Sequence, residues 1–151
     1  MDGLEKFIVA AKAATYVGNG ASRAPSRTGA HDLGYERDGW HYLDSYFGGT
    51  DFLGQETVWY LGEPVWAMNY YGRILRPDLI DAAGAGRVIK ASLSALYAQG
   101  RFLGGFEQDV GAARYADANS GTVEGFLGIE RIFIGGTEAY RLDYHGGLIK
   151  P

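Results

Sequence analysis

The sequence predicts an α+β fold, in which two main helices pack against a curved, mostly antiparallel sheet of about six to eight strands. Three observations lead to this prediction. The 24 glycines and the 14% aromatic content are typical of strands joined by tight turns. Two stretches have the apolar spacing of amphipathic helices. A run of residues is repeated 74 positions later, which predicts an internally duplicated unit of one helix followed by antiparallel strands.

The N-terminal part of the chain is predicted to be a helix followed by a loop. Residues 2–16 form the helix, because their apolar residues have the spacing of one buried face: Leu4, Phe7, Ile8, Ala11 and Ala14. Residues 17–30 form the loop, since Gly, Ser, Asn and Pro dominate them. We interpret this loop as a solvated connection, with an anion-binding or lid loop that contains Arg23 and Arg27 as the alternative.

Two hairpins are predicted next. Residues 33–47 flank Asp38-Gly39, a strong signal for a tight turn. Residues 55–71 form the second hairpin around a turn at residues 61–64. Because side chains alternate along a strand, the first hairpin places four residues on one face: Trp40, Tyr42, Asp44 and Tyr46.

The second half of the chain repeats this order. A helical region is predicted from Pro77 to about Gln99, with Gly100 as its C-terminal stop. A glycine-rich stretch at residues 104–111 follows. The remaining strands are predicted at residues 112–117, 122–128, 129–134 and 137–144, with turns at residues 119–121 and 135–136.

The repeat relates the two halves directly. Residues 126–149 align with residues 52–75 without a gap, and seven of the 24 positions are identical, where about one or two are expected for average residue usage. The identical pairs are Phe52/Phe126, Leu53/Leu127, Gly54/Gly128, Glu56/Glu130, Gly62/Gly136, Tyr70/Tyr144 and Gly72/Gly146. At a different offset, the helices match at Ile8/Ile89, Ala14/Ala95 and Tyr16/Tyr97. We therefore predict a single domain over residues 1–151, with half-repeats at about 2–75 and 78–150 related by pseudo-two-fold symmetry.

Composition excludes several classes of function. The chain has no cysteine, which excludes a disulfide framework, a thiolate metal site and a Cys nucleophile. The formal net charge of −4 disfavours direct nucleic-acid binding, which needs clustered Lys and Arg. No window approaches the apolar length of a membrane span, and Lys6 and Lys12 interrupt the apolar stretch that a signal peptide needs. We expect a cytoplasmic protein with no membrane contact, no metal and no cofactor.

Three stretches of the sequence resemble an uncharacterised bacterial domain family. They are DSYFGGTDFLGQETVWYLGEPVWAMNYYGRI at residues 44–74, YHGGLIK at residues 144–150 and SRAPSRTGAHDLGY at residues 22–35. Members of that family occur alone or C-terminal to a Cro/C1-type helix-turn-helix domain. The resemblance therefore implies a sensor or an oligomerisation unit associated with transcription regulators, and it implies no catalytic residue. Met1 leads directly into the first predicted helix, so a regulatory role would need a separate partner.

Two sets of polar residues are candidates for chemistry. Glu56 and Glu130 are repeat mates, which either share a proton near the pseudo-two-fold axis or are separate strand-end residues away from it. Asp143 and His145 lie on the same side of one strand. There His145 would serve as a general base oriented by Asp143, or the two would form a polar strand end before Gly146. Either set would support a small hydrolase or isomerase.

The aromatic residues favour a binding pocket between the two halves. Rings with carboxylates at the rim suit an amphipathic or cationic small molecule, although the same rings would also serve as core and cross-strand partners. The predicted ligand-binding residues are Trp40, Tyr42, Asp44, Glu56, Trp66, Tyr70, Glu130, Tyr140, Asp143 and His145. We favour a non-enzymatic small-molecule-binding or sensory domain. The alternatives are the small enzyme and a protein-interaction module that forms a homodimer. The predicted pseudo-symmetry resembles the duplicated drug-binding domains of the gyrase-inhibitor type in architecture alone.

Overall fold

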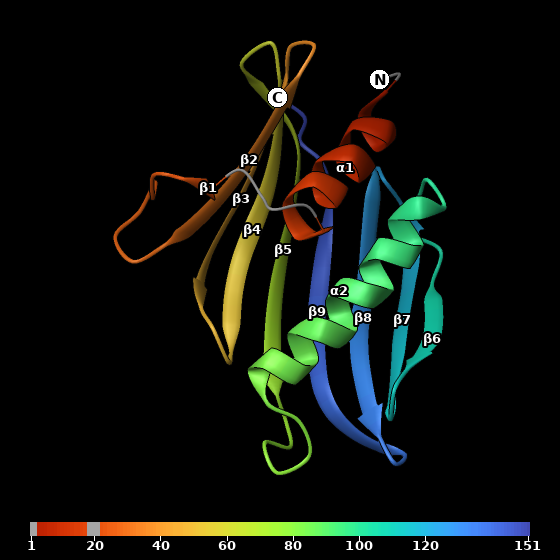
Figure 1. Ribbon diagram of the computed structural model, residues 1–151. Helices are drawn as coiled ribbons and strands as arrows, with labels where there is room; N and C mark the ends of the chain where they lie inside the picture. The colour runs from red at the N-terminus through yellow and green to blue at the C-terminus, as the bar shows by residue number, and fades with distance from the viewer. Residues whose placement is uncertain (1–2, 18–21) are drawn as a thin grey trace.

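A computed structural model of the protein describes residues 3–17 and 22–151, and most of them belong to one antiparallel sheet (Figure 1). The strands are ordered β1-β2-β3-β4-β5-β9-β8-β7-β6 across the sheet. Their bounds are β1 Ser22–Arg23, β2 His31–Arg37, β3 Trp40–Gly48, β4 Phe52–Tyr60, β5 Glu63–Ile74, β6 Phe106–Val110, β7 Ala113–Thr122, β8 Gly125–Ile134 and β9 Thr137–Leu148. The two halves of the chain therefore meet where β5 pairs with β9.

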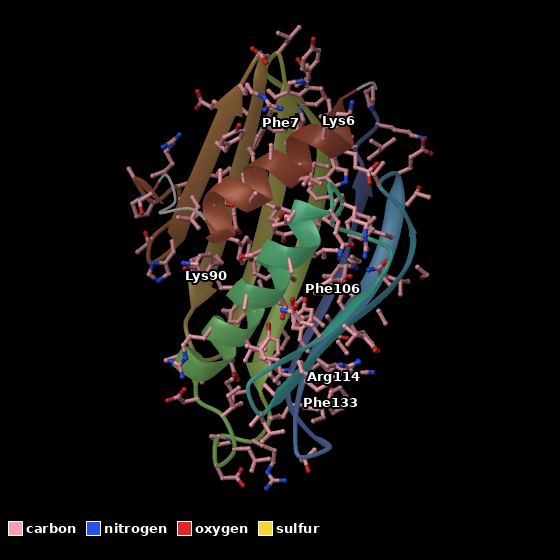
Figure 2. The ribbon with its side chains drawn as sticks, turned by 45° about the vertical axis from the view of Figure 1, so that its right-hand side comes forward. Lys6, Phe7, Lys90, Phe106, Arg114 and Phe133 are labelled. Atoms are coloured by element: carbon pink, nitrogen blue, oxygen red, sulfur yellow. The ribbon has the colours of Figure 1, made fainter. Side chains whose placement is uncertain are left out.

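Two short helices lie on the same face of the sheet (Figures 1 and 2). Helix α1 (Leu4–Lys12) continues into one turn of π-helix, η1 (Ala13–Val17), and α2 (Ala82–Ala98) connects β5 to β6. The Asp81 side chain caps α2 by accepting a hydrogen bond from the backbone N–H of Gly84, at 2.7 Å. The apolar faces of both helices pack against the sheet to form the core. Within the described residues, neither helix is long and apolar enough to cross a bilayer.

The predicted α+β class is wrong, because the sheet and not a pair of main helices dominates the chain. In the part of the chain that the structure describes, the helices have only nine residues in α1 and 17 in α2, against nine strands. Two of the strands were missed: β1 lies in the predicted loop 17–30, and β6 lies in the predicted glycine-rich stretch 104–111. Both are edge strands, so they depend on one neighbouring strand for their backbone hydrogen bonds. The start of the predicted helix 2–16 and residues 18–21 of the loop lie outside the described residues.

The predicted turn at residues 119–121 is also wrong. Strand β7 runs through these residues to Thr122, and the turn lies at Val123-Glu124. The polar Asn119 continues the strand because its side chain has tertiary partners: it accepts a hydrogen bond from the N–H of Gly104 at 2.9 Å and donates one to the Tyr144 hydroxyl at 2.9 Å. These partners are remote in sequence, so the local turn signal was misleading.

Two other predicted turns are confirmed, at residues 38–39 and 135–136, and the turn predicted at residues 61–64 is shorter, since β5 begins at Glu63. Asp38-Gly39, Leu61-Gly62 and Gly135-Gly136 each connect two strands through two residues that both have positive φ. Such pairs are the two-residue hairpin turns that match the twist of the flanking strands. They keep three hairpins in the register that the apolar alternation requires.

Residues that the 74-residue offset equates lie in matching places, although the internal duplication itself stays a prediction. Tyr70 of β5 and Tyr144 of β9 are direct register partners at the centre of the sheet. Each ring packs on a glycine of the neighbouring strand, Gly54 or Gly128, where a side chain would collide with the ring. The register also shifts at equivalent points, after Val58 in one half and after Ile132 in the other.

Candidate functional site

A cavity of about 420 Å³ lies between the two helices and the covered face of the sheet. Its wall is formed by side chains of α1, η1, α2 and strands from both halves. Figure 2 shows the two helices lying over this face of the sheet. The volume is in the range of pockets that take small organic ligands.

Four carboxylates line the cavity, and strand pairing places them in two equivalent pairs. Asp44 of β3 is the register partner of Glu56 in β4. Asp117 of β7 is the register partner of Glu130 in β8. Side chains opposite each other in adjacent strands share a face of the sheet, so each pair points toward the helices. All four residues are buried.

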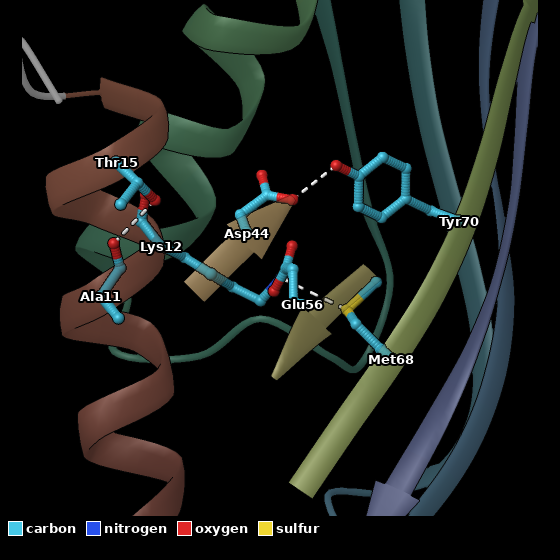
Figure 3. Close-up of polar contacts among 7 residues, drawn as sticks. All are labelled: Ala11, Lys12, Thr15, Asp44, Glu56, Met68 and Tyr70. Atoms are coloured by element: carbon cyan, nitrogen blue, oxygen red, sulfur yellow. Dashed lines mark hydrogen bonds and ion pairs between the residues drawn. The ribbon is translucent and has the colours of Figure 1, made fainter. Parts of the chain in front are cut away.

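Lys12, the last residue of α1, forms a buried ion pair with Glu56 (Figure 3). Its Nζ lies 2.8 Å from Oε1 and 2.6 Å from Oε2 of the carboxylate. The same ammonium lies 3.4 Å from Sδ of Met68 and 5.4 Å from the centre of the Phe102 ring. Lys12 is 4% exposed and Glu56 is 1% exposed, so the two charges depend on each other for compensation.

Tyrosine hydroxyls bind two of the other three carboxylates in the same way. Tyr70 donates a hydrogen bond to Oδ1 of Asp44 at 2.6 Å, as Figure 3 shows, and Tyr144 donates one to Oδ1 of Asp117 at 2.7 Å. The two aspartates are therefore held by the two tyrosines that face each other across β5 and β9.

Glu130 accepts two tyrosine hydrogen bonds. One comes from Tyr115 and the other from Tyr140, whose hydroxyl lies 3.0 Å from Oε1. The residue equivalent to Tyr115 is Tyr42, which is fully buried, yet its hydroxyl has no hydrogen-bond partner among the described residues. Each half of the site therefore has one aspartate and one glutamate, but the groups that contact the glutamate differ between the two halves.

Burial raises the pKa values of three of these carboxyl groups into the neutral range. Desolvation, reinforced by the neighbouring charge of Glu56, raises the pKa of Asp44 to about 7. Desolvation likewise raises the pKa of Glu130 to about 7 and that of Asp117 to about 6, in spite of the tyrosine hydrogen bonds that favour their ionised forms. These three carboxyl groups are therefore partly protonated at neutral pH.

We expect the free energy of unfolding to fall as the pH rises from about 4 to about 7. The unfolded chain releases these protons near pH 4, whereas the folded chain keeps them until the pH reaches the raised pKa values. In this window the native state binds more protons, so the stability decreases with pH. Carboxyl groups with lowered pKa values, such as those of Asp32 and Asp143, change the stability only below about pH 4.

Urea unfolding at pH 5 and pH 8 measures this dependence. At about 1.4 kcal/mol per unit of pKa shift, the three raised pKa values give an upper limit of about 7 kcal/mol, so the protein should be several kcal/mol more stable at pH 5 than at pH 8. Asp44→Asn removes one of the titrating groups and should flatten the profile. A stability that is equal at the two pH values would show that the carboxyls titrate normally.

Five of the ten predicted ligand-binding residues line the cavity: Asp44, Glu56, Tyr70, Glu130 and Tyr140. Three others, Trp40, Tyr42 and Trp66, are not part of its wall. Trp40 stacks on Phe7 of α1 with ring centres 5.4 Å apart. These three rings lie in the core around the cavity.

The structure places the last two predicted residues, Asp143 and His145, on the opposite face of the sheet. Along β9 the cavity face is taken by Leu142 and Tyr144, so the alternating residues point away from it. The Arg141 guanidinium binds Asp143 at 2.8 and 2.9 Å, and Nε2 of His145 lies 3.0 Å from Nδ2 of Asn69. Within the described residues, no hydrogen bond joins Asp143 to His145.

Sequence reasoning missed several residues of the cavity, chief among them Lys12, Asp117 and Tyr115. Two signals were available. Tyr-x-Asp occurs at residues 42–44 and again at residues 115–117. Lys12 follows Ile8 by four positions, so it lies on the buried face of the helix. Among residues 3–17 and 22–151, no three His, Asp or Glu side chains lie together in a way that could hold a metal ion.

Comparison with known proteins matches the chain to a family model. A family model described as "Domain of unknown function (DUF5680)" matches residues 44–149, well over half of the chain. No curated protein and no solved structure matched the chain. The expected membership of an uncharacterised domain family is confirmed.

Proposed function

The chain belongs to the DUF5680 family of domains of unknown function, and from this premise we propose that it is a non-enzymatic domain that binds a small amphipathic cation. One observation carries the proposal: four buried carboxylates face a single cavity of about 420 Å³, and Lys12 forms the one ion pair that they make among the described residues. A positively charged ligand would supply the missing compensation.

The walls of the cavity favour a ligand that is apolar as well as charged. Leucine, isoleucine and phenylalanine side chains line the cavity together with the carboxylates, and several tyrosine rings are part of the same wall. The apolar lining includes Phe52, Ile89, Leu93, Leu96, Phe102 and Leu142. Aromatic rings next to carboxylates stabilise organic cations through cation–π contacts in addition to charge pairing. An amine with an aliphatic or aromatic body matches both kinds of surface.

The family resemblance supports a sensory use of this binding. In family members that are fused to helix-turn-helix domains, ligand occupancy would be coupled to DNA binding. The two helices would transmit ligand occupancy, because residues of α1 and α2 line the cavity and Lys12 links α1 to the sheet through Glu56. The small enzyme and the interaction module stay predictions.

A thermal-shift screen with amphipathic amines, alcohols and carboxylic acids tests the proposal. A ligand at about 100 times its dissociation constant adds roughly 2.7 kcal/mol, which raises the melting temperature of a domain of this size by several degrees. We expect amines to give the largest shifts. Unchanged ligand after prolonged incubation, checked by mass spectrometry, would distinguish binding from turnover.

A matched pair of variants links binding to the cavity. Ile89→Trp places a larger ring in the cavity wall and should abolish the shift. Leu127→Trp makes a similar change on the uncovered face, where Leu127 is 62% exposed, and should leave the shift unaltered. Equal shifts in both variants, or no shift with any amine, would refute the proposed cavity binding.

A further inference from the structure

We infer that the ligand carries a single ammonium group, which binds at Asp117 and Glu130, while Lys12 fills the equivalent place at Asp44 and Glu56. This inference rests on the proposed function and specifies its ligand: a monoamine with an apolar body. In this arrangement the protein supplies one cation of the site from its own sequence and takes the other from the ligand.

The two carboxylate pairs are built alike. Each consists of an aspartate and a glutamate that are register partners in adjacent strands. In each, the aspartate accepts a hydrogen bond from a central tyrosine, Tyr70 or Tyr144, at 2.6 or 2.7 Å. A group that binds at one pair therefore has a geometrically similar place at the other.

The two pairs differ in their cations. Lys12 contacts Glu56 directly, whereas no lysine or arginine of the described chain forms an ion pair with Asp117 or Glu130. By the offset that matches Ile8 with Ile89 and Tyr16 with Tyr97, the position equivalent to Lys12 is Leu93, and its side chain lines the cavity. Lys90 also borders the cavity, but it is solvent-exposed. The second pair thus has an apolar residue where the first has an ammonium.

Tyr115 and Tyr42, the tyrosines next to the two glutamates, also differ in their hydrogen bonds. Tyr115 donates its hydroxyl to Glu130. Tyr42 is the counterpart of Tyr115 in the first pair. There the ammonium of Lys12 binds the Glu56 carboxylate, and the buried Tyr42 hydroxyl has no hydrogen-bond partner among the residues described. A buried hydroxyl is rarely unpartnered. It indicates that an ammonium and a tyrosine compete for this glutamate, and that an ammonium at Glu130 would displace Tyr115 in the same way.

This arrangement selects the charge of the ligand. A monoamine neutralises the second pair and places its apolar body against the leucine and phenylalanine side chains of the wall. A diamine would bring a second ammonium to a pair that Lys12 already fills, and like charges at close range repel. A neutral analogue would bury the same apolar body without pairing the carboxylates. The structure therefore predicts a preference for monoamine over both diamine and alcohol.

Isothermal titration calorimetry of the full chain with octylamine, 1,8-diaminooctane and 1-octanol tests the inference. Octylamine should bind at least tenfold more tightly than either of the other two compounds. Leu93→Lys supplies an ammonium of the protein's own to the second pair and should weaken octylamine binding at least tenfold. Leu93→Met is its neutral control and should change the affinity less than threefold. Circular dichroism confirms that each variant is folded.

A second pair of variants decides the question even if Leu93→Lys does not fold. The loss of octylamine affinity in Asp117→Asn should exceed the loss in Asp44→Asn by at least tenfold. Equal losses, or 1-octanol binding as tightly as octylamine, would overturn the assignment of the ammonium while leaving the cavity as a ligand site. No binding of octylamine or of 1-octanol would overturn both the inference and the proposed function.

Discussion

Replacing Lys12 with methionine is expected to lower the free energy of unfolding by about 3–5 kcal/mol, the range found when one partner of a buried ion pair is removed. Methionine keeps most of the volume of the lysine chain, so packing changes little. The loss comes from Glu56, which is 1% exposed and whose two carboxylate oxygens lie 2.8 and 2.6 Å from the lysine nitrogen. Without Lys12, its charge would be buried and uncompensated.

Chemical unfolding of matched variants measures this loss. Lys6→Met removes an exposed lysine from the same helix and should change the stability by less than about 0.5 kcal/mol. The double variant Lys12→Met/Glu56→Gln removes both charges and should recover part of the loss, since replacing both partners of a buried pair is often close to neutral. If Lys12→Met alone were as stable as the unmodified protein, the ion pair would not be a buried one in solution.

Replacing Trp66 with alanine is expected to cost about 3–5 kcal/mol of stability, as is typical when a large buried aromatic residue is truncated. Trp66 is fully buried. Its ring stacks on Phe126 at 5.8 Å and meets Phe102 edge-on at 5.9 Å. Its Nε1–H donates a hydrogen bond to the carbonyl oxygen of Val123 at 3.1 Å, which ties β5 to the turn between β7 and β8. Truncation removes this link and leaves a void in the core.

Trp59→Ala is the matched control for Trp66→Ala. Trp59 lies half-buried on the uncovered face of β4, where it packs on His41 with ring centres 5.3 Å apart. Its truncation should cost less, about 1 kcal/mol, because part of the Trp59 side chain is already in contact with water, whereas Trp66 is fully buried. Thermal and urea unfolding of both variants give the comparison. Similar losses would mean that Trp66 is not the centre of the core.

Local signals in the sequence were enough to place many of the elements. Asp38-Gly39, Leu61-Gly62 and Gly135-Gly136 form the turns that their glycines predict, since only a few residues tolerate positive φ. The alternation in β3 correctly placed Tyr42 and Asp44 on one face, because side-chain direction in a strand depends on position alone. The offset of 74 residues relates Tyr70 to Tyr144, and these two residues face each other across the two central strands, while the duplication itself stays a prediction.

Tertiary partners decided what these local signals could not. The strand β6 has a short, charged sequence, and it forms because β7 offers it backbone hydrogen bonds. Asn119 stays within a strand because Tyr144 and Gly104 bind its side chain. In both cases the partner is remote along the chain, and the local turn and glycine signals favoured other structures. For the same reason the overall class was misjudged, since edge strands carry little pattern of their own.

The sequence by itself determined three of the turns, the faces of the strands and five residues of the cavity wall, because those features depend on neighbours two to four positions away. Only the tertiary structure decided that Lys12 meets Glu56 and that Asp117 joins the same cavity as Asp44. It also separated Asp143 and His145 from that cavity, since β9 turns Leu142 and Tyr144 toward the helices. The burial that raises the pKa values of the carboxyls arises only when both helices and both halves of the sheet come together.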